Sequence, residues 1–167
     1  MNAKKKLFYK KKILIYGYGK SGIASFKYLS RNNDCKIIDD NKINISFKLK
    51  AKIINYKKLK NIYFDYIVLS PGIDINNCKL SWYLKKNKSK IITDLDIFYI
   101  SYPKIKKITI TGTNGKSTTS KLLFEVLKAH NKDVRLTGNI GNPILLERKI
   151  KNSTIFVIEA SSYQLEY

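Results

Sequence analysis

The stretch that decides the fold spans residues 106–130: an apolar run, a glycine-containing loop and an amphipathic run. The loop reads Thr111-Gly112-Thr113-Asn114-Gly115-Lys116-Ser117-Thr118. Between a strand and a helix, such a loop lets backbone N–H groups surround phosphate oxygens, and the helix N-terminus adds partial positive charge. Lys116 is then placed to reach the β- and γ-phosphates, and Ser117 or Thr118 to offer a hydroxyl to Mg²⁺. The stretch predicts a nucleoside triphosphate site.

The match to the phosphate-loop pattern is incomplete. The strict pattern begins with a glycine where this chain has Ile110. The alternative is an ordinary glycine turn at a strand–helix junction. The run from Gly115 to Thr118 and its position after an apolar strand favour the phosphate loop.

A second glycine motif comes earlier in the chain. Gly17-Tyr18-Gly19-Lys20-Ser21-Gly22 directly follows the apolar run 12–16, and Asp39 and Asp40 end the next apolar run. This spacing meets the fingerprint of dinucleotide-binding α/β domains, in which the acidic residue holds a ribose hydroxyl. The motif predicts a phosphate-bearing ligand at this turn without identifying it as NAD. A tight turn required by packing alone is the alternative.

Strand-like and helix-like segments alternate along the chain. The expected strands are 12–16, 35–39, 66–70, 90–93, 106–111, 134–137 and 154–159. The expected helices are 21–31, a short one after Asp94, and 116–130. Because alternation of this kind forms parallel sheets, the expected fold class is α/β. We expect a Rossmann-like parallel-sheet domain, residues 1–103, followed after Pro103 by the first part of a P-loop ATPase domain, residues 104–167.

Two other segments follow expected strands. Glu159 opens the segment Glu159–Glu166, and a carboxylate just past a parallel strand lies at the ligand-binding edge of the sheet. Glu159 is therefore a candidate ligand of the nucleotide's magnesium, with a helix cap or a solvated side chain as the alternative. The segment Gly138–Gly141, which contains Asn139, is a turn or a substrate-facing loop.

The composition excludes several classes of function. The net charge of +21 would suit nucleic acid, but only three of the 33 basic residues are arginine and the lysines are spread along the whole chain. Uninterrupted apolar runs are too short to span a membrane, and we expect no secretory signal, because lysines interrupt the N-terminal segment before an apolar region can form. The two cysteines have no nearby partner for a disulfide or a zinc site. We expect a cytoplasmic protein that binds neither nucleic acid nor membrane.

These motifs together resemble the Mur ligases, the ATP-dependent amide ligases of peptidoglycan synthesis. The resemblance rests on the order and spacing of Thr111–Thr118, Gly138–Gly141 and Glu159–Glu166, and it extends over residues 12–167. Within that family, the run Ser161-Ser162-Tyr163-Gln164-Leu165-Glu166 favours the members that act on D-glutamate. Residues 104–167 then correspond to an incomplete Mur ligase central ATP-binding domain, without the family's C-terminal domain.

The resemblance implies a role for each matching residue. The loop residues Gly112, Thr113, Asn114, Gly115, Lys116, Ser117 and Thr118 would bind ATP. Lys116 and Glu159 would be the catalytic groups, and Ser117 and Glu159 the magnesium ligands. The residues implied to bind the UDP-linked substrate are Gly19, Lys20, Ser21, Asp39, Ser70, Pro71, Gly72 and Asn139.

The implied reaction joins D-glutamate to UDP-N-acetylmuramoyl-L-alanine, with ATP and Mg²⁺ as cofactors. ATP converts the terminal carboxylate into an acyl phosphate, which the amine of D-glutamate then attacks. Lys116 and Mg²⁺ would neutralise charge on the transferring phosphoryl group.

The main difference between this chain and the family is the length of the chain. Residues 104–167 offer only three strands and one long helix, and the family's later magnesium-binding histidine and carbamylated lysine have no counterpart. We expect this chain alone not to form the amide bond, and a complementing C-terminal fragment in trans is a possible partner. Two alternatives stay open: a non-catalytic remnant or half of a split ligase, and an NAD-binding Rossmann oxidoreductase.

Overall fold

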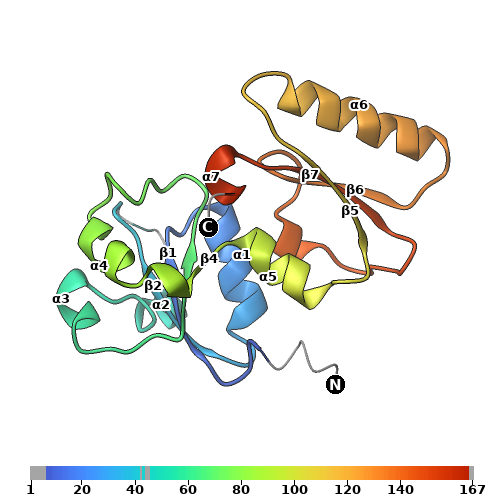
Figure 1. Cartoon of the computed structure of the whole chain (residues 1–167). Coiled ribbons are helices and arrows are strands. Elements are labelled where there is room, and N and C mark those ends of the chain that lie inside the picture. Colours follow the sequence, from blue (N-terminus) through green and yellow to red (C-terminus); the bar gives the residue numbers. More distant parts are fainter. Residues whose placement is uncertain (1–6, 42, 44–45, 166–167) are drawn as a thin grey trace.

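The computed structural model describes residues 7–41, 43 and 46–165, which form two parallel β-sheets with helices around them (Figure 1). The first part of the chain runs β1 (Lys12–Tyr16), α1 (Lys20–Leu29), β2 (Asp34–Ile38), α2 (Phe47–Lys50), α3 (Tyr56–Leu59), β3 (Tyr66–Leu69), α4 (Ser81–Lys86), the 3-10 turn η2 (Lys88–Lys90), β4 (Ile91–Ile92) and α5 (Asp94–Ser101). The second part runs β5 (Lys106–Ile110), α6 (Lys116–Ala129), β6 (Val134–Gly138), the 3-10 turn η3 (Ile144–Leu146), β7 (Ile155–Glu159) and α7 (Ser162–Leu165).

Both sheets are parallel throughout, as the alternation of strands and helices predicts. The first has the order β2-β1-β3-β4, and the second has the order β5-β7-β6. In each sheet a glycine loop follows the first strand and leads into a helix, so both loops lie at a carboxyl edge. That edge is where ligands bind in open α/β sheets.

Alternation along β1 divides its side chains between two cores. Ile13 and Ile15 point to one face and pack with α1 and α5, whereas Leu14 and Tyr16 point to the other face and pack in the core beside α3 and α4. All four are fully buried, as expected for a central parallel strand covered on both faces.

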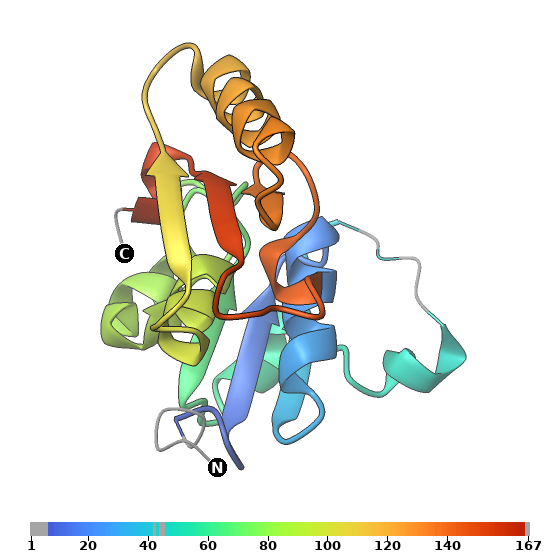
Figure 2. The ribbon, with the colours of Figure 1, turned by 90° about the vertical axis from the view of Figure 1, so that its right-hand side faces the viewer.

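A single hydrophobic cluster joins the two sheets. Phe156 and Ile158 of β7 share it with Phe98 of α5 and Ala24 of α1, and the rings of Phe98 and Phe156 lie 4.6 Å apart between centroids. The helices α1 and α5 therefore pack against the first sheet on one side and the second sheet on the other. Figure 2 shows α6 on the far side of β5 and β7 from these helices.

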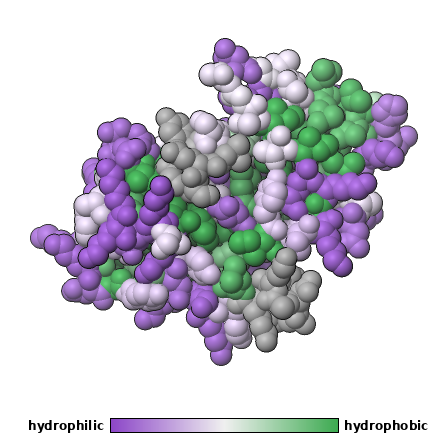
Figure 3. Space-filling view, in the orientation of Figure 1, coloured by the Kyte–Doolittle hydropathy of each residue, from purple (hydrophilic) through white to green (hydrophobic). Residues whose placement is uncertain are grey.

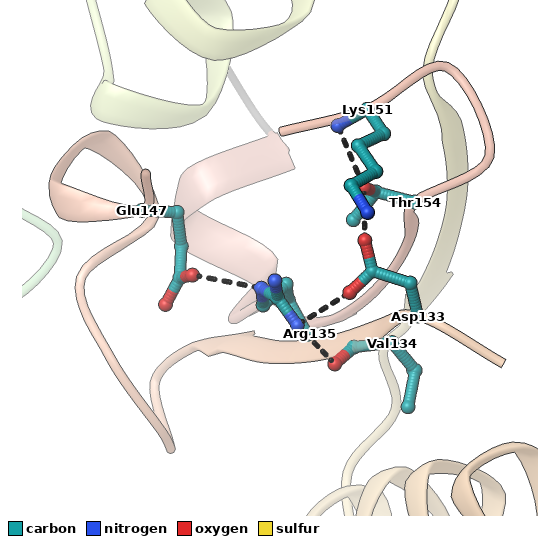
Figure 4. A network of polar contacts seen from close by, with 6 residues as sticks. All are labelled: Asp133, Val134, Arg135, Glu147, Lys151 and Thr154. Carbon is teal, nitrogen blue, oxygen red and sulfur yellow. Dashed lines mark hydrogen bonds and ion pairs between the residues drawn. The ribbon is translucent and has the colours of Figure 1, made fainter. Parts of the chain in front are cut away.

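A polar network fixes the segment that links β6 to β7 (Figure 4). The guanidinium of Arg135 contacts Oδ1 of Asp133 at 2.6 Å and Oε2 of Glu147 at 3.3 Å. Thr154 donates to the other carboxylate oxygen of Asp133 at 2.7 Å. The network holds η3, which packs against α1 and α5, and it thereby helps to fix the position of the second sheet on the first.

The surface of the second sheet is more open than that of the first. In α6 only Ser120 is buried, and Leu122 and Val126 are 65% and 47% exposed. Ile108 on the edge strand β5 is also exposed. Figure 3 shows hydrophobic residues gathered at the upper right, over this part of the molecule. None of the helices in the described residues is long and apolar enough to cross a lipid bilayer.

The structure confirms every strand and helix that the sequence predicts, with shifts of one or two residues at their ends. The short helices α2, α3, α4 and α7 were not predicted, because four to six residues give too little periodic pattern to recognise. Glu166, at the end of the family-like segment, lies outside the described residues.

Candidate functional site

A cavity of about 540 Å³ opens at the carboxyl edge of the first sheet, beside the ends of β1, β2 and β3. It brings together seven of the eight residues implied to bind the UDP-linked substrate: Gly19, Lys20, Ser21, Asp39, Ser70, Pro71 and Gly72. They come from three loops far apart in the sequence, and parallel pairing places the three loops at one edge. The cavity is large enough for a nucleotide-sized ligand.

The glycine turn after β1 is closely packed. A Cβ on Gly22 would lie 1.9 Å from the carbonyl oxygen of Gly17, and a Cβ on Gly17 would lie 2.7 Å from the Cβ of Ser70. The hydroxyl of Ser70 donates to the carbonyl oxygen of Gly17 at 2.8 Å. The first and third glycines are therefore needed for packing, whereas Gly19 faces open space.

Asp39 holds the rim of this cavity through its carboxylate. One oxygen accepts from the backbone N–H of Tyr18 at 2.6 Å, and the other accepts from that of Asn41 at 2.8 Å. Each carboxylate oxygen can accept a further bond, so Asp39 remains able to bind a ribose or base donor.

Asp40 forms a second polar cluster in the wall of the cavity. Its Oδ1 accepts from the phenols of Tyr16 and Tyr56, each at 2.8 Å, and the amine of Lys79 donates to its backbone carbonyl oxygen at 2.9 Å. Burial raises the pKa of the Asp40 carboxyl, but the hydrogen bonds from the two phenols and the contacts with Lys79 together outweigh it and hold the pKa below its ordinary value. The sequence did not reveal this cluster, because Tyr16 reads simply as a core residue.

The second glycine loop leads from β5 into α6. Gly115 caps the helix with a φ of 77°, in the left-handed region that glycine adopts without strain. The amine of Lys116 donates to the carbonyl oxygens of Gly112 and Thr113, at 2.6 and 3.2 Å. The loop from Thr111 to Gly115 is exposed, so its backbone N–H groups are accessible to an anion.

Glu159 lies at the centre of the carboxyl edge of the second sheet. Its Cα pairs with Ile110, the last residue before the phosphate loop, and with Gly138 on the other side. Its side chain is 4% exposed, and Oε2 is buried without a hydrogen-bond partner among the described residues. An unpartnered buried carboxylate oxygen next to a phosphate loop fits a Mg²⁺ ligand.

Elsewhere in the described residues, no cluster of three or more His, Cys, Asp or Glu side chains forms a metal site. The candidate cation ligands that the sequence identified are Glu159 and the hydroxyl of Ser117 or Thr118. A site with so few protein ligands is typical of Mg²⁺, which keeps several waters and binds substrate phosphates.

A second cavity, of about 450 Å³, lies between the two sheets and contains Asn139. Asn139, the eighth of the implied substrate-binding residues, does not line the first cavity. Its backbone N–H donates to the carbonyl oxygen of Glu159 at 3.0 Å, which ties this loop to the end of β7. The two cavities share Lys20, Ser21 and Pro71.

Asp94 lies at the base of the second cavity and joins the two sheets. Its carboxylate accepts hydrogen bonds from the hydroxyl of Ser21 in α1 and from the side chain of Gln164 in α7. Burial raises the pKa of this carboxyl, and both hydrogen bonds oppose the rise. Gln164 is itself buried. Sequence reasoning did not identify Asp94, whose only signal was its place at the start of a helix.

Comparisons with known proteins cover the segments that form these two sites. A family model described as the Mur ligase middle domain matches residues 110–167, the segment that begins at the phosphate loop. A UDP-N-acetylmuramoylalanine--D-glutamate ligase from Rickettsia felis is 33% identical over 163 residues, which cover 94% of this chain and 35% of that protein. Residues 110–167 of this chain are thus similar to the middle domain of the Mur ligases, and almost the whole chain is similar to the first part of one such ligase.

Other relatives of this chain carry the same name. The protein from Wolbachia sp. subsp. Brugia malayi is 36% identical and that from Lachnoclostridium phytofermentans is 37% identical. The alignments cover 92% and 95% of this chain, but 32% and 37% of those proteins. The chain thus spans about a third of the length of the curated relatives that it matches.

Among solved structures, a similar chain is the UDP-N-acetylmuramate:L-alanyl-gamma-D-glutamyl-meso-diaminopimelate ligase from Neisseria meningitides. The match covers 91% of this chain and 52% of that chain, with a TM-score of 0.48 and 15% sequence identity.

Proposed function

We propose that this chain provides the binding sites for the UDP-linked substrate and for ATP in a ligase that adds D-glutamate to UDP-N-acetylmuramoyl-L-alanine. The observation that carries the proposal is that a glycine loop leads from a strand into a helix at the carboxyl edge of each sheet, and that a cavity lies between the two sheets. In this proposal residues 1–103 are the substrate-binding domain and residues 104–167 belong to the ATP-binding domain. The proposal includes a cytoplasmic location, where nucleotide sugars and ATP are supplied.

The first cavity is the proposed site of the uridine diphosphate. Backbone N–H groups at the start of α1, with Lys20 and Ser21, suit a diphosphate, and Asp39 suits a ribose or base donor. The loop from Ser70 to Gly72 forms the facing wall. The neighbouring cavity between the sheets then accepts the N-acetylmuramoyl-L-alanine portion, with Asn139 at its border.

The loop from Gly112 to Thr118 is the proposed ATP site. Its backbone N–H groups would surround the phosphates, and the amine of Lys116 would exchange its two bonds with loop carbonyls for bonds to phosphate oxygens. Ser117 and Glu159 would hold Mg²⁺, which supplies charge neutralisation at the phosphates when bound. Lys116 adds a fixed positive charge at the same place.

The reaction follows from what each group can do. An oxygen of the substrate carboxylate attacks the γ-phosphorus of ATP, and ADP leaves, so that an acyl phosphate forms. The amine of D-glutamate attacks the acyl carbon and loses a proton, and inorganic phosphate leaves as the amide forms. Lys116 stabilises the charge on the transferring phosphoryl group, while the first cavity anchors the other end of the substrate.

Binding measurements on the 167-residue chain test the two sites separately. We expect calorimetric titration to detect binding of UDP and of ATP, and to show that UDP binds more tightly than NAD. Gly72→Leu is the sharpest variant for the first site, because a Cβ there meets no atom within 4 Å and the side chain would fill the cavity. It should abolish UDP binding and leave ATP binding intact.

Lys116→Ala should weaken ATP binding at least tenfold, in line with loss of a charged hydrogen bond worth about 1.5–3 kcal/mol, and should leave UDP binding intact. Lys128→Ala, on the same helix but in neither site, is the matched control. Binding of NAD but not UDP would favour the oxidoreductase alternative. Failure to bind either UDP or ATP would favour a non-catalytic remnant.

We also propose that further polypeptide, supplied for instance as a complementing fragment in trans, covers the open side of the second sheet. Ile108, Leu122 and Val126 expose apolar side chains there, and β5 is an edge strand. D-glutamate-dependent release of ADP, measured on the chain with and without such a fragment, tests this. Turnover by the chain alone, above that of Lys116→Ala, would contradict it.

A further inference from the structure

The cavity between the two sheets is bordered by two lysines from different helices. Lys20 begins α1, and Lys121 lies in α6. Both side chains are exposed, and neither forms an ion pair with any described residue. Asp94 is the only acid among the described residues that line the cavity, and its carboxylate is engaged by Ser21 and Gln164. The cavity is therefore suited to an anion.

The two lysines differ in which cavity they border. Lys20 lines both the first cavity and the one between the sheets, so it lies where a ligand would pass from one to the other. Lys121 lines only the second. If the nucleotide of a ligand fills the first cavity, the diphosphate of that ligand would thus contact Lys20. A more distant group of the same ligand would contact Lys121.

Lys121 also lies on the helix that the phosphate loop begins. It follows Lys116 by five residues, which is about 7.5 Å along a helix axis at 1.5 Å per residue. An anionic group held by Lys121 would consequently lie on the side of the cavity nearer the phosphate loop. In the reaction proposed above, the anionic group that must approach that loop is the carboxylate of the acyl chain.

We propose that Lys121 binds the terminal carboxylate of the UDP-linked substrate and positions it for attack on ATP, while Lys20 binds the diphosphate. This inference rests on the proposed function and assigns to its substrate a specific contact in α6. Lys121 is a positioning residue: it orients the attacking carboxylate, and Lys116 acts on the phosphoryl group.

Titration of the full chain with three ligands tests the assignment. The ligands are UDP, UDP-N-acetylmuramoyl-L-alanine, and its analogue with a terminal carboxamide in place of the carboxylate. Lys121→Gln is expected to weaken binding of the carboxylate ligand by about two- to fivefold, as for loss of one exposed ion pair. Binding of UDP and of the carboxamide should not change.

Lys128→Gln on the same helix is the matched control, since it removes the same charge outside the cavity. Glutamine is a good helix former, and Lys121 is exposed, so both variants should keep the wild-type melting temperature. Equal affinity of wild type and Lys121→Gln for the carboxylate ligand would overturn the inference. So would parallel weakening of all three ligands, which would indicate a general charge effect.

If the proposed function itself were wrong, the titrations would give a different result from failure of the Lys121 assignment alone. In that case the wild-type chain itself would bind none of the three ligands, and the inference would fall with it. If wild type binds the carboxylate ligand and only the effect of Lys121→Gln is missing, the proposed function stands and the role of Lys121 alone is rejected.

Discussion

The phenol of Tyr16 donates a hydrogen bond to the carboxylate of Asp40 at 2.8 Å, from a side chain that is fully buried to one that lines the first cavity. A core residue of β1 thus fixes a charged group at the ligand-binding edge of the sheet. Tyr56 donates to the same oxygen, so two phenols hold one carboxylate.

The stability that this bond contributes should depend on pH in a defined way. Because the two phenols help to hold the pKa of Asp40 below its ordinary value, their contribution is present above the unfolded pKa and is lost as the pH falls through the folded pKa. Tyr16→Phe should cost about 1.5–3 kcal/mol near neutral pH, with a smaller difference from wild type in acid. Urea unfolding at a series of pH values measures it, and a pH-independent cost would show that only packing is involved.

The two cysteines should differ sharply in reactivity. Cys35 is 1% exposed, and burial raises the pKa of its thiol to about 12, so it should resist thiol reagents in the folded state. Cys78 is half-buried and lines the first cavity. Mass spectrometry after brief alkylation should find Cys78 modified, and UDP should protect it. Modification at the same rate with saturating UDP would place the nucleotide elsewhere.

Two glycines of one motif should respond differently to alanine. A Cβ at Gly22 would lie 1.9 Å from a backbone oxygen of the same turn, whereas a Cβ at Gly19 meets nothing within 4 Å. Gly22→Ala should therefore destabilise by about 3 kcal/mol or more, or prevent folding. Gly19→Ala should cost less than about 1 kcal/mol. Chemical denaturation of both variants is the measurement, and similar costs would contradict the packing of this turn.

Removal of the aromatic ring between the sheets should affect both of them. Phe156 is fully buried in the shared cluster, so Phe156→Ala should cost about 3–5 kcal/mol. Ile108→Ala, on the exposed edge of the same sheet, should cost far less. Thermal unfolding followed by circular dichroism should show one transition at a lower temperature. Two separate transitions in the wild type would mean that the cluster does not couple the sheets.

Local patterns were enough to predict the strands, the long helices and both glycine loops. The run from Lys12 to Gly22 and the run from Lys106 to Thr118 each combine an apolar strand with a glycine loop, and such signals depend only on neighbours in sequence. The family resemblance implied seven residues that the structure gathers around one cavity, because parallel pairing places strand ends at a common edge.

Only the tertiary structure decided how the two sheets meet. The contacts of Asp94 with Ser21 and Gln164 join residues 73 and 70 positions apart, and the cavity beside them is lined by Lys20 from α1 and Lys121 from α6. The pairing of Tyr16 with Asp40 likewise depends on which face of β1 is turned toward α3 and α4. No local pattern encodes such contacts, because they arise from the packing of whole elements around a shared core.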